Sequence, residues 1–400
     1  MKHRIVVLGA GYAGANAAGR LARQLHPDDV EITVVNADPD FVERVRLHQL
    51  ASGQDLPRRV LADILGPRNI RVVAARVTAV DVDRRTVELA HAGGAQALGD
   101  RAPAYDTLVY ALGSTVADHG VPGVAEHSHN IAGTAAALRL RATLDNVPRG
   151  ARILVVGGGL TAIEAATEIA ESHRGLDIAI VDRDRVGGWL GDTAQRHLRT
   201  SLARLGVTVY EHTDVTRVDA HGVATDTHET IAGDVTVWTA GFAVHPIAAA
   251  TALTVGDDGR IVVDGTMRSV SHPGVYAIGD AALADGAGGR PLRMSCASGI
   301  PMAWAAADAL AARLTGRAVR ESTIGYTVQC ISLGRRDGII QRVTPDDRAT
   351  GVAVTGRVAA RIKEFVCAGA AWSIAHPTVL LPHRRRHLAV TGDPAPVVAP

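Results

Sequence analysis

The sequence predicts an α/β fold in which two similar domains, each built on a parallel sheet, are followed by a small α+β domain. Two observations lead to this prediction. A short apolar strand runs directly into a glycine-rich turn and a helix at two places, residues 4–25 and 152–172. Each helix is followed by a further apolar run, at residues 31–35 and 177–182, as expected for buried parallel strands. A chain of 400 residues is long enough for two or three such domains.

Composition excludes several classes of protein. Lysine and arginine total 42 against 41 acidic residues, and near-neutrality argues against a general nucleic-acid binder. The three cysteines, Cys296, Cys330 and Cys367, form no CxxC pair, which indicates a reducing, cytoplasmic setting and excludes a disulfide framework. No cluster has the spacing of metal ligands, so no metal site is predicted. No apolar run reaches the roughly 18 residues of a membrane span.

The first glycine-rich turn is Gly9-Ala10-Gly11-Tyr12-Ala13-Gly14. Gly9 permits a sharp exit from the strand, Gly11 lets the backbone approach a diphosphate, and Gly14 lets helix and strand pack closely. The diphosphate would lie on the unpaired N–H groups at the start of the helix. One such turn is weak evidence, but two copies in the same context predict two dinucleotide-binding sites of the Rossmann type.

The second turn is Gly157-Gly158-Gly159-Leu160-Thr161-Ala162, and its final position holds the alanine that the motif allows. Asp182 ends the next strand, where an acidic residue binds the ribose hydroxyls and favours NADH. Arg183 and Arg185 lie beside it and leave NADPH open.

In the first unit the equivalent strand end carries Asn36, which can still bind a ribose hydroxyl, with Asp38 as the fallback.

Segments between and after the two units have their own patterns. Residues 71–89 alternate valine with polar residues, which predicts antiparallel strands. Strands are expected at 105–111, 235–240 and 275–278, where they meet Gly113, Gly241 and Gly279. Residues 300–314 are alanine-rich and predict a helix, with Pro301 in its first turn. Short strands and one helix are expected over 318–383.

These motifs, taken in order, resemble a known family. Gly9 to Gly14, the run 107–113, the run 157–164 and Val275-Tyr276-Ala277-Ile278-Gly279-Asp280 are similar to those of FAD-dependent pyridine nucleotide oxidoreductases. Within that family the chain most resembles the type II NADH dehydrogenase and apoptosis-inducing-factor-like branch. The resemblance covers about residues 3 to 315 and implies two dinucleotide-binding domains of the glutathione-reductase type, with FAD in the first and NAD(P)H in the second.

The motifs and the resemblance together imply cofactor contacts at particular positions. Asp280 would hold the ribityl chain of the flavin, Val77 would touch adenine through its backbone, and Gly241 with Phe242 would flank the nicotinamide. The full set of expected cofactor-binding residues is Gly9, Gly11, Tyr12, Ala13, Gly14, Asn36, Arg44, Arg46, Val77, Ala111, Gly113, Gly157, Gly159, Leu160, Thr161, Ala162, Asp182, Gly241, Gly279, Asp280, Ser295 and Cys296.

Three residues are candidates for the chemistry itself. Glu164 would lie near the contact of nicotinamide and flavin, with a first-turn residue that complements the helix dipole as the alternative. Arg46 would lie beside the flavin ring, with a solvated helix face as the alternative. Cys296 precedes the alanine-rich helix, whose N-terminus would face the flavin, and is either a redox thiol or a buried inert cysteine.

The electron acceptor is the least determined feature. A quinone-like small molecule is the first expectation, although the paired glutamines of type II NADH dehydrogenases are replaced here by Arg293 and Ala297. A ferredoxin-type protein, a biosynthetic substrate and a slow-turnover redox sensor stay open. Dithiol transfer from the first unit is excluded, because no cysteine lies between Gly14 and Gly113. His376 is interpreted as structural, because no acidic residue follows it closely.

Domain boundaries follow from this reading. We expect an FAD-binding domain at 1–116 and 243–318, an NAD(P)H-binding domain at 117–242, a C-terminal interface domain at 319–390 and a flexible tail at 391–400. The C-terminal domain would cover the flavin or form a homodimer interface. The apolar run 367–381 with Trp372, followed by Arg384-Arg385-Arg386, leaves open a weak peripheral contact with the inner face of the membrane.

Overall fold

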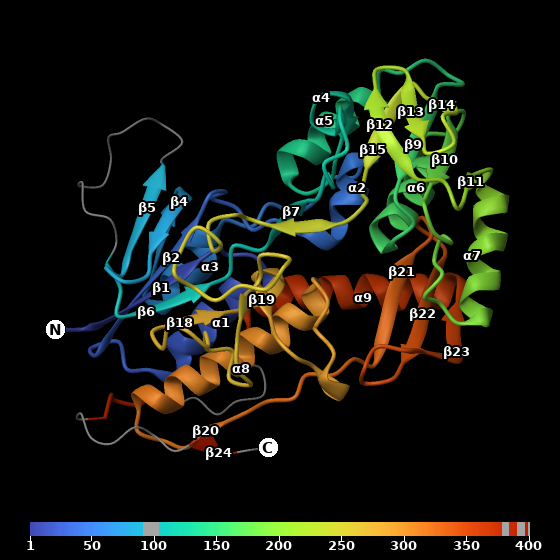
Figure 1. Cartoon of the computed structure of the whole chain (residues 1–400). Helices are drawn as coiled ribbons and strands as arrows, with labels where there is room; N and C mark the ends of the chain where they lie inside the picture. Colours follow the sequence, from blue (N-terminus) through green and yellow to red (C-terminus); the bar gives the residue numbers. More distant parts are fainter. Residues whose placement is uncertain (91–103, 378–383, 390–396, 399–400) are drawn as a thin grey trace.

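The computed structural model describes residues 1–90, 104–377, 384–389 and 397–398. Two parallel sheets lie at opposite ends of the molecule, and a smaller antiparallel sheet with a long helix lies beside the second (Figure 1). The helix α9 (Gly356–Ala375) runs between the two ends of the molecule. This arrangement matches the predicted α/β class.

The first sheet has the strand order β18-β6-β1-β2-β3, and all its pairs are parallel. Its strands are β1 (His3–Leu8), β2 (Val30–Asn36), β3 (Ile70–Ala74), β6 (Thr107–Tyr110) and β18 (Val275–Ala277). The strand β18 returns to this sheet after the whole second unit, so the second unit is an insertion between β6 and β18.

The expectation of antiparallel strands over 71–89 is correct only for its later part. The strands β4 (Arg76–Asp81) and β5 (Thr86–Ala90) form an antiparallel hairpin. The strand β3 instead pairs in parallel with β2 along its whole length. Alternation of valine with polar residues misleads here because β3 is the edge strand, with one side exposed.

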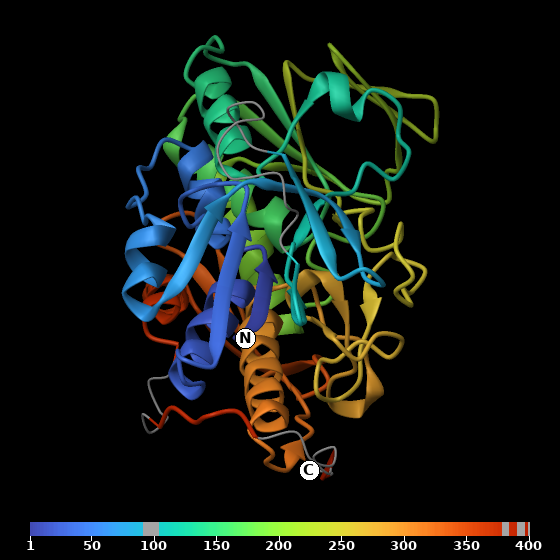
Figure 2. The ribbon, with the colours of Figure 1, turned by 90° about the vertical axis from the view of Figure 1, so that its left-hand side faces the viewer.

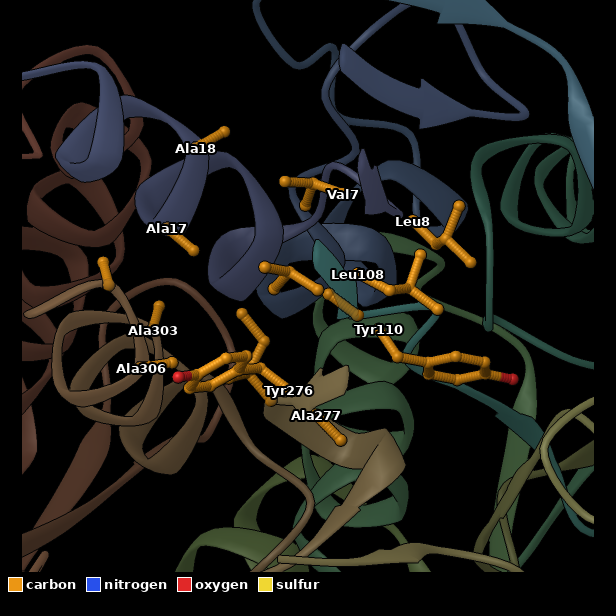
Figure 3. Packing of buried hydrophobic residues seen from close by; sticks show 14 of the residues in the cluster. Val7, Leu8, Ala17, Ala18, Leu108, Tyr110, Tyr276, Ala277, Ala303 and Ala306 are labelled. Carbon is orange, nitrogen blue, oxygen red and sulfur yellow. The ribbon is translucent and has the colours of Figure 1, made fainter. Parts of the chain in front are cut away.

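Two alanine-rich helices pack against each other beside the first sheet. They are α1 (Tyr12–Gln24) and α8 (Cys296–Leu314). Ala17 and Ala303 are fully buried, and Figure 3 shows the alanines of both helices beside strand residues such as Tyr276. Small side chains allow close approach in a chain that has only 3% aromatic residues.

The helix α8 begins four residues before the predicted start, so Pro301 lies in its second turn rather than its first. Proline has no N–H to donate to the carbonyl four residues earlier. The carbonyl of Ala297 therefore has no helical partner.

The second sheet has the order β11-β10-β9-β15-β8 and is also parallel. Its strands are β8 (Ser128–His129), β9 (Arg152–Val156), β10 (Asp177–Val181), β11 (Thr208–Tyr210) and β15 (Val235–Trp238). The helices of this unit are α4 (Val124–His127), α5 (Thr134–Leu144), α6 (Leu160–Ser172) and α7 (Asp192–Leu205). A small antiparallel sheet is formed by β12 (Val215–Asp219), β13 (Gly222–Thr225) and β14 (Thr230–Ala232).

Short elements connect the larger units. Between β2 and β3 lie α2 (Leu47–Ala51) and α3 (Leu61–Leu65), with the 3₁₀ turns Arg44–Arg46 and Gly66–Arg68. The two crossings between the first and second units pair antiparallel as β7 (Ser114–Val116) and β16 (Phe242–Val244). The parallel pair β17 (Ile261–Val262) and β19 (Ala282–Leu283) flanks β18 in the chain, with 3₁₀ turns at Gly279–Ala281 and Ala287–Gly289.

The C-terminal region consists of β21 (Val328–Ser332), β22 (Gly338–Val343), β23 (Ala349–Thr355) and α9. The three strands form one antiparallel sheet that contacts α9, and also contacts α6 and α7 of the second unit. Figure 2 shows the molecule from the side of the first sheet, with α8 in front. Of the predicted tail 391–400, only β24 (Val397–Val398) lies within the described residues, and it pairs with β20 (Val319–Arg320).

Two buried carboxylates, of Asp337 and Glu168, fasten the C-terminal sheet to the second unit. Asp337 is 7% exposed and accepts hydrogen bonds from Ser201 Oγ at 2.7 Å and from Arg204 Nη2 at 2.6 Å. Arg335 Nε lies 2.5 Å from Glu168 Oε1, and Gln54 Nε2 donates to the same oxygen. Breaking a buried ion pair leaves an uncompensated charge, so these contacts hold the two units in one arrangement.

We predict that Gly14→Ala destabilises the protein by about 1–3 kcal/mol, the usual range for an overpacked site. A Cβ at this position would lie 1.9 Å from the carbonyl oxygen of Gly9, and backbone cannot move aside cheaply. Gly369→Ala is the matched control, because Gly369 lies within α9 and a Cβ there meets nothing within 4 Å. Thermal unfolding would show equal melting temperatures for both variants if the packing argument were wrong.

Candidate functional site

A single cavity of about 990 Å³ joins the two glycine-rich turns. Its walls come from the first sheet, the second sheet, the start of α8 and the helix α9. The predicted site residues that border it are Gly11, Tyr12, Ala13, Arg44, Ala111, Gly113, Gly157, Gly159, Leu160, Thr161, Glu164, Asp182, Gly241, Gly279, Asp280, Ser295 and Cys296. Residues from distant parts of the sequence thus meet at one place.

The first turn has the geometry that a diphosphate requires. Gly9 has φ +93°, and a Cβ there would lie 2.2 Å from the carbonyl oxygen of Ala111. Gly11 differs, because a Cβ there meets nothing within 4 Å. Gly11 is also the N-cap of α1 and supplies no capping side chain. Open space therefore lies in front of the first N–H groups of α1, which suits an anionic group.

Six predicted residues do not border the cavity within the described part of the chain: Gly9, Gly14, Asn36, Arg46, Val77 and Ala162. Asn36 Oδ1 accepts a hydrogen bond from the N–H of Ala10 at 2.8 Å, and its Nδ2 donates to the carbonyl of Asp38. Asn36 therefore holds the glycine turn in place. Val77 is buried in β4 at 7% exposure.

Arg46 is occupied by acidic residues on two sides. Its Nε lies 3.6 Å from Glu43 Oε2, and its Nη2 pairs with Glu364 of α9. The guanidinium thus links the region after β2 to the C-terminal helix.

Gly14 and Ala162 serve the close packing of α1 and α6 instead, since a Cβ at Gly14 would lie 1.9 Å from the carbonyl oxygen of Gly9 and Ala162 is fully buried.

Asp280 lies at the centre of a polar group on the first unit. Its Oδ2 accepts a hydrogen bond from Ser114 Oγ at 2.6 Å and lies 3.9 Å from Arg44 Nη1. Arg44 donates to the carbonyl of Ser114 at 2.8 Å and lies over the ring of Phe242. Gly279 has φ +67°, and a Cβ there would press on the Cβ of Ala13. The carboxylate is therefore held beside the first glycine turn.

The second turn repeats the geometry of the first. Gly157 has φ +116°, and a Cβ at Gly158 would meet the carboxyl carbon of Asp182 at 2.6 Å. A Cβ at Gly159, the N-cap of α6, meets nothing within 4 Å. Asp182 Oδ1 accepts a hydrogen bond from the N–H of Asp184. The carboxyl group thus borders the cavity directly beside the turn, as expected of a side chain that binds the hydroxyls of a ribose.

A buried charged group closes the cavity between α6 and α9. Glu164 is 4% exposed, and its Oε1 accepts hydrogen bonds from the N–H of Ser332 and from Lys363 Nζ, both at 3.0 Å. Burial alone would raise the pKa of Glu164, but Lys363 and His48 hold it below its ordinary value. Burial opposes the charge on Lys363 too, yet Glu164 raises the pKa of this amine. Both groups therefore stay ionised.

His48 completes this group from the side of α2. Its Nδ1 lies 3.8 Å from Glu164 Oε2, and the side chain is 4% exposed. Burial lowers the pKa of His48 to about 4, so the imidazole is neutral near pH 7. Within the described residues Nε2 has no hydrogen-bond partner, and His48 borders the cavity. A buried nitrogen of this kind calls for a ligand or an ordered water.

All three cysteines of the chain border the same cavity. Cys296 begins α8, Cys330 lies in β21 and Cys367 lies in α9. Burial raises the pKa of each thiol, for Cys367 to about 11. The thiols are therefore protonated near neutral pH, which favours the inert alternative for Cys296 over a reactive thiolate.

Arg293 and Ala297 also border the cavity. Arg293 Nε lies 2.5 Å from Asp347 Oδ2, and its guanidinium lies over the ring of Tyr326. The guanidinium of Arg293 is thus already paired with side chains of the protein itself.

Sequence reasoning missed Lys363 and His48. Lys363 is one of several cationic residues of the C-terminal part, and no motif marks it. His48 lies in the segment considered for Arg46, but nothing in the sequence showed that its neighbour would be Glu164. Among the described residues, no group of three His, Cys, Asp or Glu side chains is arranged to hold a metal ion.

Comparison with known proteins agrees with this geometry. Residues 3–310 match the family model described as pyridine nucleotide-disulphide oxidoreductase. The chain belongs to this family. It is 31% identical over 320 residues to an NADH dehydrogenase-like protein of Mycobacterium tuberculosis, covering 75% of this chain and 78% of that protein. It is 23% identical over 404 residues to a type II NADH:quinone oxidoreductase of Staphylococcus haemolyticus, covering 93% and 96%.

Solved structures show the same fold. NDH2 of Plasmodium falciparum aligns with a TM-score of 0.76 at 13% identity, over 96% of this chain and 99% of that one. A sulfide:quinone oxidoreductase of Aquifex aeolicus aligns with a TM-score of 0.75 at 17% identity, over 98% and 99%. The protein is therefore an NAD(P)H-dependent oxidoreductase of the Rossmann type that uses a flavin and a nicotinamide cofactor.

We predict that His48→Asn makes the protein less sensitive to acid. The folded state holds His48 neutral down to about pH 4, whereas the unfolded state takes up a proton near pH 6.5. Stability is therefore lost as the pH falls from about 6.5 toward 4, by about 2 kcal/mol between pH 6.5 and 5.

The charged groups around His48 are Glu164, which favours its protonation, and Lys363, Arg335 and Arg46, which oppose it. Between pH 7 and pH 5, urea unfolding should show a smaller loss of the free energy of unfolding for His48→Asn than for the wild type. An equal loss of this free energy in both proteins would contradict the lowered pKa of His48.

Proposed function

We propose that the protein is an FAD-dependent NADH dehydrogenase that passes electrons to a quinone-like small molecule. One observation carries this proposal: a single cavity is bordered by both glycine turns, by Gly279 and Asp280, and by an apolar wall from the C-terminal region. Two dinucleotides held on the two turns would meet inside it. We also propose the division into an FAD domain at 1–116 and 243–318, an NADH domain at 117–242 and an interface domain at 319–390.

The residues present fit both cofactors. The first turn, with open space at Gly11 and a carboxylate at Asp280, would hold FAD by its diphosphate and its ribityl hydroxyls. The second turn, with open space at Gly159 and a carboxylate at Asp182, would hold NADH by its diphosphate and ribose. Asp182 beside a ribose disfavours the additional phosphate of NADPH. When bound, FAD accepts hydride from NADH and hands two electrons to the acceptor.

The chain itself supplies position and electrostatics. The N-termini of α1 and α6 would bind the two diphosphates, and the start of α8 directs its positive end into the cavity. Lys363 Nζ keeps its proton and Glu164 stays ionised, so the pair adds no net charge to the wall. An uncharged acceptor can then approach without displacing a counter-ion.

The acceptor side of the cavity is apolar. Val328, Val366 and Ala370 border it together with the thiols of Cys330 and Cys367. Such a wall suits a flat apolar ring rather than a charged substrate. This wall supports a quinone-like acceptor, in spite of the missing glutamines.

The decisive experiment follows flavin absorbance in a rapid-mixing instrument without oxygen. We expect the purified protein to carry FAD. NADH should bleach the flavin absorbance faster than NADPH does, and menadione should reoxidise the flavin fast enough to account for steady-state turnover. Two other outcomes would change the assignment of the acceptor. Rapid reduction of an added ferredoxin would indicate a protein partner, and slow turnover with every acceptor would indicate a redox sensor. A protein that neither contains nor takes up FAD would refute the proposal.

An exposed apolar face on α9 supports contact with a membrane surface. Val358, Ile362, Phe365 and Trp372 follow helical spacing, and the exposed fraction of Phe365 reaches 79%. Within the described residues, no helix has both the length and the apolar character to span a bilayer. We propose that this face lies on the inner leaflet and that Arg357 and Arg361, both exposed, contact anionic headgroups.

Flotation with vesicles that contain phosphatidylglycerol tests this contact. We expect wild type to float and Phe365→Asp to remain at the bottom of the gradient, because a charge in the apolar face opposes insertion. Val270→Asp is the control, since Val270 is 57% exposed but lies outside α9. Failure of the wild type to float, together with a dimer in light scattering that Phe365→Asp disrupts, would assign the face to a homodimer instead.

A further inference from the structure

One buried glutamine joins the C-terminal sheet to the segment that precedes α7. Gln341 lies in β22 and is fully buried. Its Oε1 accepts a hydrogen bond from the N–H of Gly191 at 3.2 Å, and Gly191 is the N-cap of α7. Figure 1 shows α7 beside β22 and β23. The side chain of Gln341 therefore reaches from the C-terminal sheet into the second unit.

The other end of the same amide holds an irregular part of β23. The ladder between β22 and β23 shifts its register next to Gln341, and residues 350–352 have no regular partner there. The Nε2 of this side chain lies 2.8, 2.8 and 3.0 Å from the carbonyl oxygens of Arg342, Thr350 and Val352. The amide thus supplies hydrogen bonds that the irregular ladder lacks.

A tight turn connects Gly191 to the second glycine turn. The N–H of Leu190 donates to the carbonyl of Gly187 at 2.9 Å, directly before Gly191. Gly187 has φ +65°, and a Cβ there would lie 2.6 Å from a methyl group of Leu198 in α7. Because this turn is short and closely packed on α7, a displacement of Gly191 would also move Gly187.

Gly187 in turn holds one peptide unit of the second glycine turn. Its N–H donates to the carbonyl of Gly158 at 3.2 Å. That carbonyl and the N–H of Gly159 belong to one planar trans peptide, so the two groups point in opposite directions. Within the described part of the chain the N–H of Gly159 has no backbone hydrogen-bond partner, and a Cβ on Gly159 would meet nothing within 4 Å. A bond to the carbonyl therefore fixes the direction of an N–H that is free for a ligand.

We propose that Gln341 is a positioning residue for the dinucleotide on the second turn, because it sets the direction of the Gly159 N–H through residues 187–191. This inference rests on the proposed use of NADH at that turn, and it adds that the C-terminal sheet controls the affinity. Gln341 is not among the described residues that border the cavity, so it would act only through the connecting segment. The hydrogen bond from an N–H at a helix start to an anionic oxygen depends on that direction.

The first experiment measures binding of ADP-ribose, which carries the diphosphate without the nicotinamide, to the FAD-loaded protein by titration calorimetry. Gln341→Met removes the amide but keeps a side chain of similar length. We expect the Kd to rise about tenfold, because a hydrogen bond to a charged group is weakened. The KM for NADH should rise by a similar factor, whereas the maximal rate of flavin reduction should change by less than about twofold.

Gly191→Ala breaks the same link from its other side. A Cβ there would lie 2.6 Å from the carbonyl oxygen of Thr350, although the φ of −69° suits alanine. This variant should also bind ADP-ribose more weakly. Asp337→Asn is the matched control, because Asp337 ties the same sheet to Arg204 of α7 without contacting residues 187–191. The control should lower the melting temperature and leave the Kd for ADP-ribose unchanged.

Hydrogen exchange of the wild type tests the link without any substitution. Coupling between two sites is reciprocal, so saturating ADP-ribose should slow exchange of the backbone N–H groups of β23 by the same factor, about tenfold. The hairpin of β4 and β5 in the first unit is the control region, where exchange should not change. This measurement requires neither turnover nor a folded variant.

Two results would overturn the role of Gln341. One is an unchanged Kd for ADP-ribose in folded Gln341→Met or, if neither variant folds, an unchanged exchange rate in β23 of the wild type. The other is an equal rise of the Kd in Asp337→Asn, which would show general loosening of the sheet. Failure of the proposed function looks different, because the wild type would then neither bind ADP-ribose nor be reduced by NADH.

Discussion

Close contact between backbone segments at the first glycine turn is the constraint on which the rest of the structure depends. Gly14 lies against the carbonyl of Gly9, Gly9 lies against Ala111, and Gly279 lies against Ala13. The end of β1, the start of α1, the end of β6 and the turn after β18 are thereby brought within side-chain distance of one another. Any larger residue at these points would separate the segments and widen the place where a diphosphate binds.

The second turn depends on the same constraint, with Gly158 against the side chain of Asp182. Because both turns border one cavity, backbone rather than flexible side chains would set the position of a dinucleotide on each turn. Preorganisation of this kind reduces the reorganisation that a transfer between two bound molecules would otherwise require. The charged pair of Glu164 and Lys363 then joins the second unit to α9 at the place where the two sites meet.

The sequence was informative where a local pattern determines structure. The two strand–turn–helix units follow from short motifs, and the family comparison agrees with the fold class that they predict. The edge position of β3 was not predictable, because alternation of valine looks the same in a hairpin and at a sheet edge. The start of α8 was placed too late because Pro301 is usual in a first turn.

Contacts between distant segments were beyond local reasoning. Lys363 and His48 reach Glu164 from α9 and α2, and only tertiary packing brings them there. The convergence of three cysteines on one cavity is of the same kind, since their spacing in the chain carries no signal. Asn36 was expected to face a ligand, but its amide holds the turn, which no residue pattern distinguishes.

The contacts of Asp337 and Arg335 have a consequence for motion between the units. They brace the C-terminal sheet against α7 and α6, so the part of the cavity wall that comes from this sheet is fixed to the second unit. A displacement of the second unit would therefore carry that part of the wall with it.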